Sequence, residues 1–143
     1  MKTPPDVKTS TSLTFESNRP VATILLVEDE SGLREPIRDY LRKQPYEVLE
    51  AADGAEALGI AEGRQQLHVL ITDVMMPNIN GLELAKRLRQ RFPEMKVIFM
   101  SGYAEDKLGE PEVFQDSALL QKPFPLRSLR NKLQELLTTR LSV

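Results

Sequence analysis

The sequence has 143 residues, enough for one domain with an ordinary core, and its 19 basic and 21 acidic residues give a formal net charge of -2. This balanced charge excludes the broad basic surface of a nucleic-acid-binding protein, and the lack of cysteine excludes disulfides and thiolate metal ligands. Because no apolar run reaches the roughly 18 residues that a membrane span needs, we expect a cytoplasmic protein without direct contact to nucleic acid or membrane.

The first 20 residues are rich in threonine, serine and proline, and they lack the continuous apolar segment of a secretory signal. We interpret residues 1–20 as a flexible N-terminal tail or linker and residues 21–143 as the folded domain. From that point on, apolar runs alternate with helical patterns. This alternation is typical of a parallel sheet with crossover helices.

The apolar run Thr23–Val27 predicts a buried first strand. Ser31 is a suitable N-cap for the helix that follows, in which apolar residues recur at helical spacing (Leu33, Ile37, Tyr40 and Leu41). Glu47–Ala51 predicts the second strand. After a turn at Asp53-Gly54, Ala55–Gln65 predicts the second helix.

His68–Thr72 predicts the third strand, Leu82–Phe92 the third helix and Val97–Met100 the fourth strand. Glycine and proline interrupt residues 103–114, so we expect a short or irregular fourth helix there. Ala118–Gln121 predicts the fifth strand. The last helix is amphipathic, with an apolar stripe of five leucines (Leu126, Leu129, Leu133, Leu136 and Leu137).

Polar side chains follow four of the predicted strands at the same end. Glu28 and Asp29 follow the first strand, Asp73 the third, Ser101 the fourth and Lys122 the fifth. Ligands of open parallel sheets bind outside the carboxyl ends of the strands, so we expect these residues to converge on one pocket.

Three carboxylates in one pocket would repel one another, and a divalent cation would relieve that repulsion. With no cysteine and a single histidine in the chain, the donors are oxygens, which favour Mg²⁺, or Mn²⁺ in its place. The backbone carbonyl of Met75 could supply a further oxygen. Such a site beside Lys122 and the Ser101 hydroxyl suits a phosphoryl group, with Asp73 as nucleophile and an acyl phosphate as product. Each residue alone is more often a turn former, a cap or a surface residue; their joint order favours the site.

Four stretches carry a family resemblance: LLVEDE, ITDVMMPNINGLEL, VIFMSGYAED and LLQKPF. From about Thr23 to Leu137 the chain resembles the receiver domain of two-component response regulators. The resemblance implies an α/β fold of the flavodoxin-like, three-layer class. Its five-stranded parallel sheet has the order 2-1-3-4-5 and five flanking helices.

The resemblance also implies roles for the residues at the strand ends. Asp73 matches the phosphoacceptor, Ser101 the switch hydroxyl and Lys122 the phosphoryl-binding lysine, while the metal site matches four positions (Glu28, Asp29, Asp73 and the Met75 carbonyl). The family usually has a cis peptide bond at the position of Lys122–Pro123. Two positions concern the conformational switch. Leu119 replaces the aromatic residue that the family often uses, and Tyr103 is expected to shape access to the site instead.

The combination of SGYAED with LLQKPF is most similar to receivers attached to hybrid histidine kinases. The sequence contains no ATP-binding or histidine-phosphotransfer segment, and His68 opens a buried strand, so we interpret it as structural. The phosphoryl donor is therefore expected to be a histidine kinase or histidine-phosphotransfer domain, in another chain or in another part of the same protein. The resemblance leaves the output partner open and allows a phosphorylation-dependent dimer.

Two other functions compete with the phosphoacceptor. An interaction module could use the same scaffold without being phosphorylated, although competent residues fill all the expected positions. A true phosphatase with an aspartyl nucleophile usually carries a second Asp two residues later, where this chain has Met75. By itself the receiver would catalyse only its own phosphorylation and slow dephosphorylation, and it fits both a stand-alone protein and a fragment of a larger kinase.

Overall fold

The structure is a computed structural model that describes residues 20–102 and 115–141. Its five strands are β1 (Ala22–Val27), β2 (Tyr46–Ala51), β3 (Val69–Asp73), β4 (Lys96–Ser101) and β5 (Ser117–Gln121). Its four helices are α2 (Ser31–Arg42), α3 (Gly54–Glu62), α4 (Gly81–Arg91) and α5 (Leu126–Leu141). All strand pairs are parallel, and the order in the sheet is β2-β1-β3-β4-β5.

This topology confirms the predicted fold class and strand order. The described residues contain four helices where the sequence predicted five around the sheet. The missing helix was expected in residues 103–114, which lie outside the described residues, as does nearly all of the predicted tail at 1–20. Among the described residues, no helix is both long and apolar enough to cross a membrane.

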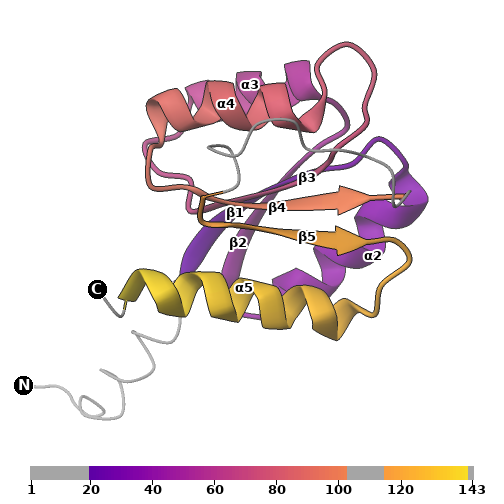
Figure 1. Ribbon diagram of the computed structural model, residues 1–143, viewed down its shortest axis with the longest axis vertical. Helices are drawn as coiled ribbons and strands as arrows, with labels where there is room; N and C mark the ends of the chain where they lie inside the picture. Colours follow the sequence, from indigo (N-terminus) through magenta and orange to yellow (C-terminus); the bar gives the residue numbers. More distant parts are fainter. Residues whose placement is uncertain (1–19, 103–114, 142–143) are drawn as a thin grey trace, which may run out of the picture.

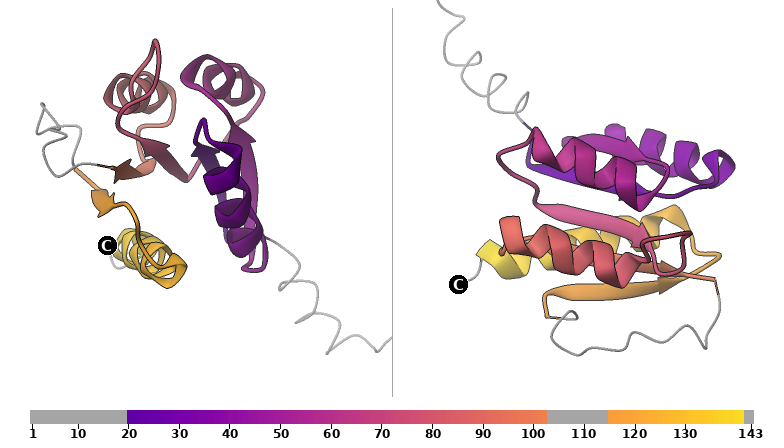
Figure 2. Two further views of the ribbon diagram at one scale, coloured as in Figure 1. Left: turned by 90° about the vertical axis from the view of Figure 1, so that its right-hand side faces the viewer. Right: turned by 90° about the horizontal axis from the view of Figure 1, so that it is seen from above.

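The three central strands are buried along their whole length, because helices cover both faces of the sheet. In Figures 1 and 2, α3 and α4 cover one face, and α2 and α5 cover the other. Successive side chains of a strand point to opposite faces. Leu25 of β1 therefore packs in the core under α3 and α4, and its neighbours Ile24 and Leu26 pack in the core under α2 and α5.

Side-chain caps fix the starts of two helices on one face of the sheet. Asp53 accepts a hydrogen bond from the Glu56 N–H at 2.8 Å, and Glu56 accepts one from the Ala52 N–H at 2.8 Å, which starts α3. Asn80 accepts from the Glu83 N–H at 2.9 Å and starts α4.

Two predicted helix ends were wrong. Ser31 is the first helical residue of α2, and Glu30, with extended backbone, occupies the cap position without a side-chain hydrogen bond. The helix α3 ends at Glu62 and not at Gln65, because Gly63 follows as its C-cap and glycine is a poor residue for continuing a helix.

Candidate functional site

Glu28 is the first residue after β1, and hydrogen bonds hold both its backbone and its side chain. Its N–H donates to the Ala51 carbonyl of β2 at 3.1 Å. Its carboxylate accepts from the Glu30 N–H at 3.1 Å and from Lys122 Nζ at 2.9 Å. The residue is 1% exposed. A carboxylate buried to this degree needs such partners, because an unpaired ionised group in the interior is very unfavourable.

Asp73 is the last residue of β3 and lies at the centre of the sheet, opposite Met100 of β4. It is buried, and its Oδ1 lies 2.6 Å from Lys122 Nζ. The next strand fixes the backbone here, because the Val74 N–H donates to the Met100 carbonyl at 2.9 Å. On the other side, Gly81 packs so closely that an added Cβ would overlap the Asp73 carbonyl oxygen. Only glycine fits this approach.

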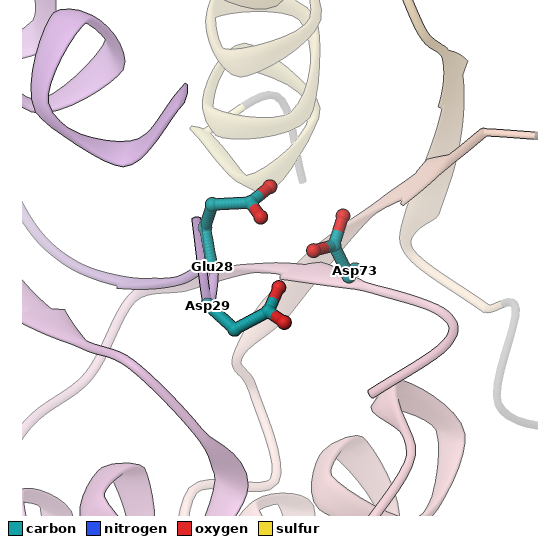
Figure 3. A group of neighbouring side chains, drawn as sticks. All are labelled: Glu28, Asp29 and Asp73. Carbon is teal, nitrogen blue, oxygen red and sulfur yellow. The ribbon is translucent and has the colours of Figure 1, made fainter. Parts of the chain in front are cut away.

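The three predicted carboxylates meet at one point. One oxygen each of Glu28, Asp29 and Asp73 lies within 4.8 Å of the others, and Figure 3 shows the three groups around a common space. Glu28 and Asp73 are buried, whereas Asp29 is exposed. They line a hollow of about 460 Å³ to which Met75 and Lys122 also contribute. This oxygen-only donor set fits a hard divalent cation such as Mg²⁺.

Lys122 follows β5 and brings a positive charge between two of these carboxylates. Its ammonium contacts both Glu28 and Asp73, although Glu28 is 94 residues away along the chain. The backbone N–H of Lys122 donates to the Ser101 carbonyl at 2.7 Å, and this bond fixes the start of the loop after β5. The Lys122–Pro123 peptide bond is cis, the isomer predicted at this position.

The remaining predicted site residues differ in how close they lie to the carboxylates. Ser101 ends β4, is buried, and is the residue after Met100, which lies opposite Asp73. Met75 lines the hollow, and the residue is 66% exposed. Leu119 lies on β5 opposite Phe99, is 47% exposed, and does not line the hollow. Tyr103 lies outside the described residues.

Burial and charge shift the pKa values of the site in different directions. Burial raises the pKa of Asp73 to about 7, Glu28 acts in the same direction, and Lys122 opposes the shift without cancelling it. Burial also disfavours ionised Glu28, but hydrogen bonds from Lys122 and the Glu30 N–H outweigh it and hold the Glu28 pKa below its usual value. Burial disfavours charged Lys122 as well, and its two carboxylate partners outweigh this and raise its pKa. Glu28 and Lys122 therefore form a stable ion pair, whereas the ionised form of Asp73 is the least favourable of the three charged groups.

The sequence pattern did not identify two residues that support the site. Arg34 of α2 donates from Nη1 to the Glu28 carbonyl at 2.8 Å. Gly81 packs against the Asp73 carbonyl, and this packing was not anticipated. A glycine before a helix and an arginine on the polar face of a helix carry no signal of their tertiary contacts.

Comparisons with known proteins identify the family of the chain. Residues 24–134 match the family model described as the response regulator receiver domain. The chain is 40% identical to the sensor kinase CckA of Brucella abortus (strain 2308) over 119 residues, which are 81% of this chain and 12% of that protein. It is 34% identical to the response regulator receiver protein CpdR of the same organism over 115 residues, which are 80% of this chain and 95% of that protein.

A solved structure gives the same result. The crystal structure of the receiver domain from the hybrid histidine kinase CckA superposes with a TM-score of 0.68 at 39% identity, covering 80% of this chain and 98% of that one. Receiver domains act as phosphoacceptors in two-component signalling, bind Mg²⁺ at an acidic pocket, and interact with histidine kinases or phosphotransfer proteins. This chain belongs to the family of response regulator receiver domains.

Proposed function

We propose that Asp73 accepts a phosphoryl group from a phosphohistidine in a Mg²⁺-dependent step, and that the chain then slowly hydrolyses the resulting acyl phosphate. The observation that carries this proposal is the contact between the Asp73 carboxylate and Lys122 in a hollow shared with Glu28 and Asp29. This arrangement supports phosphoryl transfer because it offers a nucleophile, a cation site and a fixed positive charge within one small space.

Asp73 is the most suitable nucleophile of the three carboxylates. Glu28 is occupied by hydrogen bonds from Lys122 and the Glu30 N–H, and Asp29 is exposed to solvent. Asp73 ends the central strand, is buried, and has a pKa raised to about 7 by that burial. A carboxylate with a raised pKa is a stronger base when ionised and a better nucleophile.

In the transfer step, an Asp73 carboxylate oxygen bonds to phosphorus as the phosphorus–nitrogen bond of the phosphohistidine breaks. The imidazole nitrogen keeps the electron pair of that bond and takes up a proton. Lys122, released from its contact with Asp73, pairs with the phosphoryl oxygens, and the Ser101 hydroxyl donates a hydrogen bond to one of them. In hydrolysis, a water oxygen bonds to phosphorus as the bond between phosphorus and the Asp73 oxygen breaks. The Asp73 carboxylate keeps the electron pair of that bond, the water gives a proton to solvent, and inorganic phosphate leaves.

Glu28, Asp29, Asp73 and the backbone carbonyl of Met75 would hold the Mg²⁺ ion. When bound, the ion neutralises negative charge on the phosphoryl oxygens. Lys122 and Glu28 already form an ion pair in this hollow, so the lysine keeps part of the negative charge balanced before any ion enters.

The phosphoryl donor is a histidine kinase or histidine-phosphotransfer domain, and we assign its docking to an apolar groove beside the site. The groove measures about 390 Å³, and its apolar lining comes from α2, the loop after β5 and the first residue of α5 (Leu33, Pro36, Ile37, Pro123, Phe124 and Leu126). It also includes Glu28 and Lys122, so a helix docked there would bring its histidine close to Asp73. Because the kinase uses ATP, we infer that this exchange takes place in the cytoplasm.

Intact-mass measurement after incubation with Mg²⁺ and a small phosphodonor tests the assignment. We expect the natural chain to gain one phosphate and the Asp73→Asn variant to gain none. Asp53→Asn is the matched control, because it also removes one carboxylate while asparagine keeps the cap of α3. Equal labelling of the Asp73→Asn variant would refute the assignment, and an unlabelled natural chain that also fails to bind Mg²⁺ would favour the interaction module.

A further inference from the structure

The peptide unit between Glu28 and Asp29 is held by Arg34, a residue of α2 that does not line the acidic hollow. Arg34 Nη1 donates to the Glu28 carbonyl at 2.8 Å. Nε of the same guanidinium donates to Glu50 Oε1 on β2 at 3.0 Å. The Arg34 side chain is 17% exposed, so water competes weakly for these bonds. A guanidinium is planar and rigid, so it ties the loop after β1 to the neighbouring strand with a fixed geometry.

The two acidic residues of this loop differ in what else restrains them. The Glu28 N–H and both of its carboxylate oxygens have partners, as described above. Asp29 is exposed, and no described residue donates a hydrogen bond to its carboxylate. Its position beside Glu28 and Asp73 therefore depends on its backbone. The Asp29 N–H belongs to the same peptide plane as the Glu28 carbonyl that Arg34 holds.

We propose that Arg34 is a positioning residue of the divalent-cation site, which keeps the Asp29 carboxylate directed at the ion that Glu28 and Asp73 also hold. This inference rests on the proposed function, because it concerns the same cation. Arg34 touches neither the ion nor the phosphoryl group in this role; it acts through the peptide unit that carries Asp29.

Charge and position predict opposite effects when Arg34 is removed. Arg34 is itself a cation close to the acidic residues, so loss of its charge alone would strengthen the binding of another cation. Loss of its hydrogen bond to the Glu28 carbonyl would let the loop move and would weaken binding. The sign of the change in Mg²⁺ affinity therefore separates a positioning role from a purely electrostatic one.

Arg38, one turn further along α2, is a matched control for the ion pair. Its Nη1 donates to Glu50 Oε2 at 3.0 Å, the same length as the bond from Arg34 to the other oxygen of that carboxylate. Of the two arginines, Arg34 is the one that donates to the Glu28 carbonyl. Substituting either one removes one positive charge and one bond to Glu50. Arg38→Met also removes a bond to the exposed Asp39 on the same helix, at 2.9 Å, so Arg38 is a control for the charge and for the bond to Glu50.

The test is titration of the full chain with Mg²⁺ by isothermal calorimetry, with thermal unfolding in EDTA as a check of the fold. We expect Arg34→Met to weaken Mg²⁺ binding roughly tenfold, at the low end of the range for residues that orient metal ligands. Arg34→Lys should weaken Mg²⁺ binding by about threefold, because a lysine ammonium keeps the positive charge but not the planar set of donors of the guanidinium. Arg38→Met should stay within about twofold of the natural chain, since its contacts do not reach the loop. If Arg34→Met unfolds at a much lower temperature than Arg38→Met, the Arg34→Lys variant carries the test.

A double-mutant cycle with Asp29→Asn identifies the carboxylate that Arg34 positions. In the Asp29→Asn background, Arg34→Met should change Mg²⁺ affinity by less than about twofold, because the group that it positions is already gone. The same tenfold loss in both backgrounds would overturn the assignment to Asp29. Unchanged or tighter binding by Arg34→Met would overturn the positioning role while leaving the proposed function intact. Failure of the natural chain to bind Mg²⁺ would instead overturn the cation site itself.

Discussion

Two charged clusters lie side by side near the ends of β1 and β2, and their charge balances are opposite. The acid-rich cluster places three carboxylates around one ammonium (Glu28, Asp29, Asp73 and Lys122). The arginine-rich cluster places three guanidiniums around one carboxylate (Arg34, Arg38, Arg42 and Glu50). Arg34 joins the two, because it bonds both to Glu50 and to the Glu28 carbonyl.

The pKa shifts show how differently the clusters satisfy their charges. Burial raises the pKa of Asp73 to about 7, and Lys122 does not offset it. Burial also disfavours ionised Glu50, but Arg38 and Arg34 outweigh it and lower the Glu50 pKa. In the arginine-rich cluster, the Glu50 carboxylate is therefore paired within the cluster, and these ion pairs hold α2 on β2. The acid-rich cluster keeps negative charge that a bound cation can satisfy, and this difference supports the proposed cation site there.

Removal of Lys122 is expected to have the largest effect on the difference between the clusters, because it takes the positive charge out of the acid-rich cluster. We expect Lys122→Met to lower the rate of phosphate uptake by about 100-fold or more, as for the loss of one group that stabilises transition-state charge. The measurement is the rate of labelling by intact mass at fixed Mg²⁺. Lys132→Met, which removes a half-exposed lysine paired with Glu135 on α5, should label normally. A Lys122→Met rate within threefold of the natural chain would contradict the prediction.

A change at Gly81 would disturb the acid-rich cluster without altering any charge. The added Cβ of Gly81→Ala would overlap the Asp73 carbonyl oxygen, so the backbone must shift. We expect a loss of about 2 kcal/mol in the free energy of unfolding, the size typical of overpacking. Urea unfolding measures it.

Gly59 of α3 provides the control, because a Cβ there would meet nothing within 4 Å. Gly59→Ala should stabilise the chain by about 0.5–1 kcal/mol, since alanine is the better helix former. Equal stability of the two alanine variants would show that Gly81 is not held by this close approach.

The effect of pH on the stability of a Glu50 variant tests the arginine-rich cluster. Because the Glu50 pKa is lower in the folded chain than its ordinary 4.5, its ion pairs stabilise the fold above that pH, and the effect is lost as the pH falls further. Glu50→Gln should therefore cost about 1 kcal/mol of unfolding free energy at neutral pH and little at pH 3. Chemical unfolding at both pH values measures the difference. A pH-independent cost for Glu50→Gln would exclude the ion pairs as its cause.

Much of the site could be predicted from the sequence because it is built on strand ends. The apolar runs before Glu28, Asp73 and Ser101 predicted buried strands, and parallel strands bring their carboxyl ends to one edge of the sheet. Two predicted helix ends were wrong, because Ser31 is the first helical residue of α2 and not its cap, and α3 ends at Glu62, with Gly63 as its C-cap. Leu119, at the position where the family often has its aromatic switch residue, lies half-exposed on β5 and does not line the hollow.

By itself, the sequence determined the class of fold, the strand order implied by its family resemblance, and the set of oxygen and nitrogen groups at the edge of the sheet. Apolar periodicity and chain direction suffice for this, because both are local properties of the chain. Only the tertiary structure decided that Lys122 pairs with Glu28 as well as Asp73, that Gly81 packs on the Asp73 carbonyl, and that Arg34 holds the loop. Some of these contacts join residues that are far apart in the sequence, and the others depend on side-chain directions that no local pattern encodes. They are therefore set by how the elements pack in the folded chain.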